Sequence, residues 1–410
     1  MKTMIKASLV VGLLASLASV NLQAKDSDLN IIDNVKLKGE IRTRYERVDT
    51  DNGVEANALT NRLQLGVAAD LLGTQWLSAY AELTNVSALN NNYNDTYADN
   101  GVEGNQVVAD PSQTRITQNY LDFKYGKTKF RAGRQLMVLD NQRFIGAVGW
   151  RQMPQTFDAY TVTDSTVKGL NLFASYITSV NRIFHEDDTK GNFDTRSLLL
   201  NASYQVMPEL KVTAYSYMIG EGTSGASDTY GLSLTGKLPV SDGLTLNYRA
   251  EYAMQDDPSM ENAGLASNSN VQVDAEYYKL EAGIAANGIL GGLAYELLSG
   301  QDTGGKTAFS TPLATLHGHN GWADKFLSTP TSGLVDTSIM LGYKSKKLGL
   351  FKAIYHDYSS EVGSIDYGTE INAVYKTKVP GVKKLGLLLK VADYRGGDSV
   401  AQGNDSSRAT

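Results

Sequence analysis

Hydrophobic and polar residues alternate along most of this chain in segments of about ten residues or more. In 244–255 one face carries only Leu, Tyr, Ala and Met, while the other carries mainly Thr, Asn, Arg, Glu and Gln. Segments 35–46 and 367–379 repeat the pattern. A period of two over this length predicts β-strands long enough to cross a membrane when tilted.

Seventeen such segments are predicted, and the links between them alternate between short turns and long polar loops. Short turns use Gly, Pro, Asn and Asp, as tight turn geometry requires, and the longest loops are 87–113, 138–154 and 301–333. One rim of short turns and one rim of long loops is typical of an outer-membrane barrel. The predicted strands are 35–48, 58–71, 75–86, 114–126, 128–137, 155–164, 169–181, 195–206, 209–219, 228–239, 244–256, 272–286, 290–300, 334–345, 349–358, 367–379 and 385–395.

The polar face of these strands is too rich in charge to form a dry core. A strand with one apolar and one charged face fits lipid outside and a wet lumen inside. Aromatic residues stand near the segment ends, where interfacial girdles form; they include Tyr45, Tyr125, Tyr204, Tyr343, Phe351 and Tyr375. The predicted fold class is therefore all-β, a transmembrane antiparallel β-barrel.

Seventeen strands is an odd number, whereas closed bacterial barrels normally have an even one. We therefore expect about 18 strands in the full protein, with the tail 396–410 as a polar loop and the C-terminal strand missing. Such a truncated barrel would have a gap or seam between 35–48 and 385–395. The alternative is one miscounted strand, for which 128–137 and 290–300 are the weakest candidates.

The first 24 residues differ from the rest. Lys2 and Lys6 precede an apolar stretch that ends near Ala24, which is typical of a secretory signal peptide; a short membrane anchor is the alternative. No composition shift divides the remainder, so we expect a single barrel domain over 25–410. The chain has no cysteine, and its net charge of −6 argues against nucleic-acid binding.

Two stretches carry the most distinctive motifs. Residues 133–159 read GRQLMVLDNQRFIGAVGWRQMPQTFDA, and residues 311–336 read TPLATLHGHNGWADKFLSTPTSGLVD. Both resemble the alginate-export family of outer-membrane barrels. The resemblance implies an 18-stranded barrel with a charged lumen that acts as a channel. In the founding members the family exports an anionic polysaccharide, while many relatives look like solute porins.

Charged residues in the first motif and on the polar strand faces are candidates for pore selectivity. Rings of arginine select anions, and carboxylates temper that field. The alternative is that these residues pair with each other and hold an inward-folded loop in place. Alternation along the strand places Arg134 on the same face as Phe130 and Ala132, which are expected to face lipid. This conflicts with a lumen position for Arg134, and a bulge or the strand's end would explain the conflict. The candidates are Arg42, Arg44, Arg62, Arg131, Arg134, Asp140, Arg143, Arg151, Asp158, Arg249 and Glu251.

Metal-binding and catalytic motifs are weak by comparison. His317 and His319 with Asp324 could bind a metal, but their spacing is not a recognised ligand pattern, and a packed loop around Trp322 is preferred. No Gly-x-Ser-x-Gly surrounds a plausible nucleophile, and no phosphate-binding loop has the required context. We expect no enzyme activity, no cofactor and no metal.

The function that this pattern favours is a bacterial outer-membrane porin with passive diffusion of polar or anionic solutes through a charged lumen. A dedicated exporter of an anionic polysaccharide such as alginate, a specific small-solute uptake porin and a non-conducting structural barrel are the alternatives. The expected partners are a polar or anionic solute or polysaccharide and outer-membrane lipid. The sequence leaves the oligomeric state open.

Overall fold

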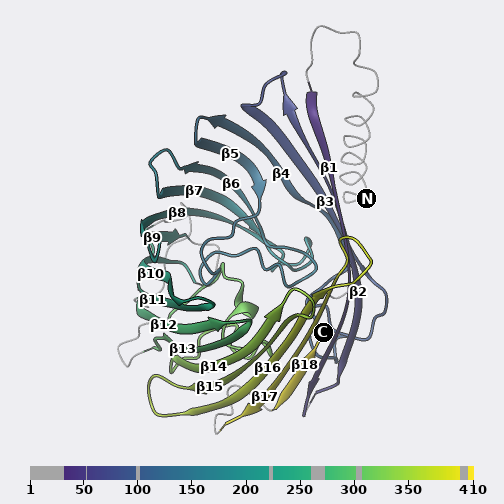
Figure 1. Ribbon diagram of the computed structural model, residues 1–410. Helices are drawn as coiled ribbons and strands as arrows, with labels where there is room; N and C mark the ends of the chain where they lie inside the picture. Colours follow the sequence, from purple (N-terminus) through teal and green to yellow (C-terminus); the bar gives the residue numbers. More distant parts are fainter. Residues whose placement is uncertain are drawn as a thin grey trace.

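The computed structural model describes residues 32–51, 53–97, 102–220, 225–259, 273–301, 307–397 and 405–410. The predicted signal peptide, 1–24, lies outside these residues. Eighteen antiparallel strands and one short 3-10 helix, η1, are described (Figure 1). Their bounds are β1 Ile32–Thr50, β2 Ala56–Leu71, β3 Leu77–Ala88, β4 Gln113–Tyr125, β5 Thr128–Gln135, β6 Thr156–Asp164, β7 Leu170–Asn181, β8 Asn192–Met207, β9 Leu210–Ile219, β10 Ser227–Ser241, β11 Leu244–Asp256, β12 Asp274–Ala286, β13 Ile289–Leu298, η1 Leu316–Gly318, β14 Leu334–Ser345, β15 Gly349–Ser359, β16 Asp366–Lys378, β17 Gly386–Gly396 and β18 Ser406–Ala409.

Each strand pairs with its neighbours in sequence, and β1 pairs with both β2 and β18, so the sheet closes on itself. The predicted all-β antiparallel barrel is thus confirmed, and each of the seventeen predicted strands overlaps an observed one. Short turns alternate with long loops as expected. The turn between β12 and β13 has Asn287 and Gly288 at positive φ, the geometry of a tight two-residue hairpin. Within the described residues, no helix is long and apolar enough to span a bilayer.

The count of seventeen strands, with 396–410 as a polar loop, was wrong. Residues 406–409 form β18, which pairs with Arg47–Thr50 of β1 on one side and with Val391–Tyr394 of β17 on the other. Four residues of Ser, Arg and Ala are too short to display a period of two. Pairing on both sides, rather than intrinsic preference, therefore defines this strand.

Closure covers only the end of the barrel that carries the long loops. Among the described residues, the part of β1 before Arg47 pairs with β2 alone. The expected seam between the first strand and the seventeenth is therefore present towards the rim of short turns. Next to the long loops β18 closes it.

Side chains alternate between the two faces of the wall. Leu37, Ile41 and Leu341 point outward and are 65–74% exposed. Near the rim of short turns, the outward rings of Phe351 and Tyr375 stack with centroids 4.3 Å apart. An apolar outer face with aromatic residues at its edge is what a lipid bilayer requires.

Long loops fill the half of the barrel interior that lies away from the short turns. The segment after β5 and the segment containing η1 run inside the ring (Figure 1). Phe144 of the first segment packs against the inward rings of Tyr215 and Tyr277, with centroids 5.2 and 5.5 Å apart, and against Phe309 of the second. The sequence predicts a wet lumen throughout, but this half contains a hydrophobic core. Alternation along a strand predicts which face of the wall a residue occupies, but it does not predict which loops cover that face.

The outer face generates a stability prediction. Leu341→Arg places a charge in lipid and should destabilise the barrel by about 2–4 kcal/mol if it lies near the bilayer centre. Ser338→Arg, on the inner face of the same strand, β14, should cost much less because its charge stays in water. Urea unfolding in lipid vesicles measures both variants. Equal losses of stability would contradict the assignment of the two faces.

Candidate pore constriction

Arg42 fastens the first inward loop, residues 136–155, to the barrel wall. From β1 it donates hydrogen bonds to Gln152 Oε1 at 2.8 Å, to the Gly149 carbonyl at 2.9 Å and to the Arg151 carbonyl. Positive φ at Asp140 and Val148 helps the loop to reverse direction. No carboxylate of a described residue lies within 4.0 Å of Arg42, so its positive charge has no direct counter-ion.

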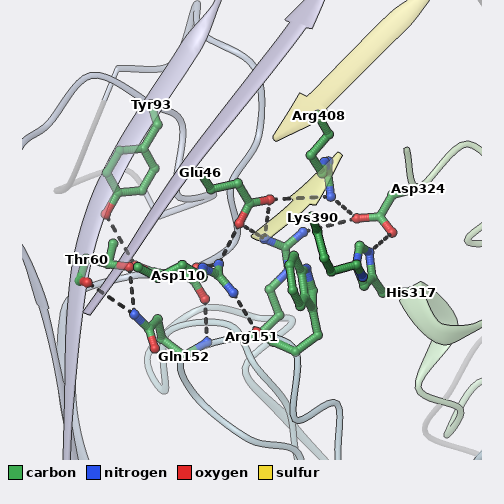
Figure 2. A network of polar contacts seen from close by, with 12 residues as sticks. Glu46, Thr60, Tyr93, Asp110, Arg151, Gln152, His317, Asp324, Lys390 and Arg408 are labelled. Atoms are coloured by element: carbon green, nitrogen blue, oxygen red, sulfur yellow. Dashed lines mark hydrogen bonds and ion pairs between the residues drawn. The ribbon is translucent and has the colours of Figure 1, made fainter. Parts of the chain in front are cut away.

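Glu46 is the centre of the polar network drawn in Figure 2. Its carboxylate is fully buried and forms ion pairs with Arg44 at 2.6 Å, Arg151 at 3.4 Å and Arg408 at 3.5 Å. Arg44 shares strand β1 with Glu46, Arg151 comes from the first loop, and Arg408 comes from β18. One carboxylate thus joins the wall, the loop and the closing strand.

Asp110, from the loop between β3 and β4, extends the network along the wall. It pairs with Arg44 and accepts a hydrogen bond from the Gln152 backbone N–H at 2.7 Å. The Gln152 side chain in turn donates to Thr60 Oγ1 on β2 at 2.8 Å. Arg62, also on β2, pairs with Glu40 and reaches the Gln152 carbonyl at 3.4 Å. These contacts fix the loop against β1 and β2.

Asp324 connects the second inward loop, residues 307–333, to the same centre. It pairs with Arg408, with Arg151 at 3.2 Å, and with His317 Nδ1 at 2.6 Å (Figure 2). Burial alone would raise the pKa of Asp324, but Arg408, His317 and Arg151 hold that pKa well below its usual range. The carboxylate therefore stays ionised.

His317 is held as a neutral imidazole. Its Nδ1 faces Asp324, and its Nε2 lies 2.8 Å from the ammonium of Lys390 on β17, so Nδ1–H donates and Nε2 accepts. Burial lowers the pKa of His317 to about 4; Asp324 opposes this shift, and Lys390 and Arg408 add to it. The Lys390 ammonium also lies 4.1 Å from the Trp150 ring centre and 3.9 Å from that of Trp322, a cation–π arrangement.

The first loop also reaches the opposite wall. Arg143 is buried and pairs with Glu296 of β13 at 3.1 Å. Asp140 accepts a hydrogen bond from Asn201 of β8 at 2.9 Å and lies 3.9 Å from Lys211 of β9. The loop is therefore attached on both sides and spans the lumen.

Two further candidates pair on the wall near this loop. Arg249 and Glu251 of β11 lie 2.8 Å apart, and Glu251 accepts a hydrogen bond from Tyr215 at 2.9 Å. These residues line the lumen beside the hydrophobic core. They form a site separate from the Glu46 network.

The structure separates the remaining candidates from this network. Arg131 forms a two-pronged pair with Asp122 at 2.6 and 2.8 Å. Arg134 pairs in the same way with Asp158 at 2.7 and 2.8 Å. Arg134 and Asp158 are in register and lie on the same face of the wall as Tyr160, two positions beyond Asp158. Tyr160 points outward and is 56% exposed. The conflict in the parity of Arg134 is thus explained by an outward position near the end of β5.

The sequence prediction missed much of the network. Glu46, Asp110, Asp324, Lys390 and Arg408 were not among the selectivity candidates, and Asp324 was considered only as a possible metal ligand. Parity already placed Glu46 on the polar face, but only the fold brings Arg408 to it. The described residues contain no group of three or more His, Cys, Asp or Glu side chains placed to bind a metal ion.

The network has more positive than negative groups. Arg42, Arg44, Arg62, Arg151 and Arg408 are five arginines, whereas Glu40, Glu46, Asp110 and Asp324 are four carboxylates. With His317 neutral, the arginines exceed the carboxylates by one. This arrangement lowers the energy of an anion near the loop.

A family model described as alginate export matches residues 33–256. No curated protein matches the chain. Among solved structures, Pseudomonas aeruginosa OpdL has a TM-score of 0.67 at 16% identity, covering 92% of this chain and 96% of its own. Acinetobacter baumannii OccAB1 has a TM-score of 0.69 at 14% identity, and the match covers 94% of this chain and 97% of OccAB1. Pseudomonas aeruginosa OpdK, crystallised with vanillate, has a TM-score of 0.67 at 14% identity, and the match covers 92% of this chain and 96% of OpdK. At these identities the structures establish a shared barrel fold.

The Glu46 network generates a stability prediction. Glu46→Gln leaves three arginines without their shared carboxylate, and breaking a buried pair in this way costs about 3–5 kcal/mol. Glu55→Gln is the matched control, because its pair with Arg47 is partly exposed and should be worth less than about 1 kcal/mol. Unfolding in urea measures both. A Glu46→Gln loss as small as that of the control would contradict the role of Glu46.

The neutral state of His317 generates a pH prediction. In an undocked loop His317 gains its proton near pH 6.5, but in the docked loop only near pH 4. Docking is therefore strongest above about pH 6.5 and weakens as the pH falls towards 4, by at most about 1.4 kcal/mol per unit. Burial also lowers the pKa of His319, to about 3, which adds in the same direction.

Single-channel recording across pH 7.5 to 4.5 checks this prediction. Conductance should rise on acidification as the loop loosens, and His317→Gln should make the dependence shallower. An unchanged pH dependence in His317→Gln would show that another group is responsible.

Proposed function

Because this chain belongs to the alginate-export family of outer-membrane β-barrels, we propose that it is a passive channel for small polar solutes that prefers anions. The porin-like barrel fold is established by the strand pairing and by the similar solved structures. Such a barrel resides in the bacterial outer membrane, with lipid against its apolar face. The proposal concerns what passes through the lumen and why.

The observation that carries the preference for anions is Arg42. Its guanidinium donates only to Gln152 Oε1 and to backbone carbonyls of the loop. The surrounding network has one more arginine than it has carboxylates. Charge fixed beside a narrow passage acts strongly on ions, because protein walls of low dielectric focus its field. Chloride and small carboxylates should therefore enter more readily than potassium.

The two inward loops favour small solutes. Gly146 N–H donates to the Leu313 carbonyl at 2.9 Å, and Thr315 N–H donates to the Gln142 carbonyl at 3.0 Å. Loops joined in this way leave less room than the open barrel would. The similar barrel OpdK was crystallised with vanillate, a small carboxylate, which agrees with this size class.

A dedicated exporter of an anionic polysaccharide is the second candidate. The match to a family model described as alginate export favours it, because the matched residues 33–256 include the whole first loop. Polymer passage would require the joined loops to move apart. Uronate oligomers that block the current from the short-turn side, and cross into liposomes, would support this candidate over the small-solute channel.

Reversal potentials in asymmetric KCl test the anion preference. A unit charge about 10 Å from the ion path is worth about 0.4 kcal/mol per ion in water-like surroundings. Arg42→Gln should therefore reduce the chloride-to-potassium permeability ratio about fourfold, since both ions are affected. Arg42→Lys keeps the charge and should keep the ratio.

Arg134→Gln is the matched control, because Arg134 lies on the outward parity of β5 and should leave the ratio unchanged. A chloride-to-potassium permeability ratio that is unchanged in Arg42→Gln would contradict the assignment of Arg42 as the source of selectivity. Absence of any current from the refolded protein would contradict the channel itself and favour a structural barrel.

A further inference from the structure

A second part of the lumen is open and has a different chemistry. A cavity of about 700 Å³ lies along β8 to β15, on the short-turn side of η1. Its volume is typical of sites for small organic ligands. The cavity borders His319 and Asn320 of the second loop at one end. It is therefore separate from the Arg42 and Glu46 network on β1.

The wall of this cavity includes an apolar surface on the inward face of the strands. Leu290 of β13, Met340 of β14 and Ile354 of β15 line it. Elsewhere the inward parity of these strands carries Glu296, Asp336 and His356, all buried. An apolar surface inside a water-filled lumen suits a ligand with an apolar body.

Glycine residues create the space. Gly283 of β12 and Gly292 of β13 face each other in register, and Gly292 is also in register with Met340. A Cβ added at Gly292 would lie 3.2 Å from Met340 Cε and 3.6 Å from the Ala282 carbonyl oxygen. The nearest obstacle is the flexible end of a methionine, so a larger residue at this position can be accommodated and would occupy the cavity.

Lys352 provides a cation beside the apolar surface. It stands on β15 two positions from Ile354, is half-buried and lines the cavity. No carboxylate of a described residue lies within 4.0 Å of it. The nearby Arg249 and Lys279, in contrast, share Glu251, Glu281 and Glu296. Lys237 of β10 also lines the cavity without an ion pair among the described residues, but it is exposed. Lys352 is half-buried and stands beside the apolar surface, so its charge is the one that an amphiphilic ligand would neutralise.

We propose that this cavity binds a small amphiphilic carboxylate. The carboxylate pairs with the Lys352 ammonium, and the apolar body lies over Leu290, Gly292, Met340 and Ile354. Neither half suffices, because an exposed ion pair alone is weak and an apolar body alone gains no charged partner. The physiological role rests on the proposed function, since the ligand would reach the cavity through the lumen.

Benzoate is the test ligand, measured by saturation-transfer NMR and calorimetry on the refolded full-length protein in detergent. Acetate has the charge without the body, and benzyl alcohol has the body without the charge. Benzoate should bind saturably and at least about tenfold more tightly than either, the order expected from a lost charge-assisted bond or a lost apolar contact. Equal binding of benzoate and acetate would overturn the proposal.

Substitutions locate the site. Lys352→Met should weaken benzoate binding about tenfold, and Lys352→Arg should retain it. Gly292→Leu should abolish binding by filling the cavity. Lys124→Met, on strand β4, is the matched control and should bind as the wild type does. Unchanged affinity in folded Lys352→Met and Gly292→Leu would overturn the assignment.

Bilayer recording separates this inference from the proposed function. Benzoate added on the short-turn side should reduce chloride current in the wild type and much less in Lys352→Met. An anion-selective channel that does not bind benzoate would refute the cavity site and leave the channel standing. Benzoate binding without any current would support the site and refute the proposed function.

Discussion

The buried carboxylate of Glu46 joins the barrel wall, the first inward loop and the closing strand. Removing a carboxylate from water costs several kcal/mol, which only well-placed partners offset. Here the partners are Arg44, Arg151 and Arg408, and each belongs to a different part of the molecule. The ionised state of Glu46 therefore requires the wall, the inward loop and the closing strand to be assembled together. This requirement links barrel closure to the shape of the pore.

The lumen has two unlike halves. Near the long loops, arginines and carboxylates fix the loops at their edges, and Phe144 and its aromatic neighbours fill the centre. Towards the short turns, small residues such as Gly283 and Gly292 leave the strands uncovered. A solute would first meet the charged edge of the packed half and then the apolar wall of the open half. We therefore propose that selection by charge and selection by shape occur in different parts of the lumen.

Much of the fold follows from the sequence because a lipid-facing wall imposes a strict period of two. Arg42, Arg44 and Arg62 could be placed on the lumen side for that reason, and the long loop 138–154 could be expected to fold inward. β18 could not be predicted, because four residues carry no periodic signal and depend on β1 and β17. The distant partners of Glu46 could not be predicted either, because Arg151 and Arg408 are more than 100 positions away from it in the sequence. The outward position of Arg134 could not be predicted either, because only the structure shows that its charge is paired with Asp158.

We propose that fixed, incompletely balanced positive charge at the loop makes this barrel an anion-preferring channel. The sign of the reversal potential of the wild-type protein in a planar bilayer, with KCl at different concentrations on the two sides, tests it most directly. We expect a stable open channel whose reversal potential lies towards that of chloride. A reversal potential towards that of potassium would contradict it.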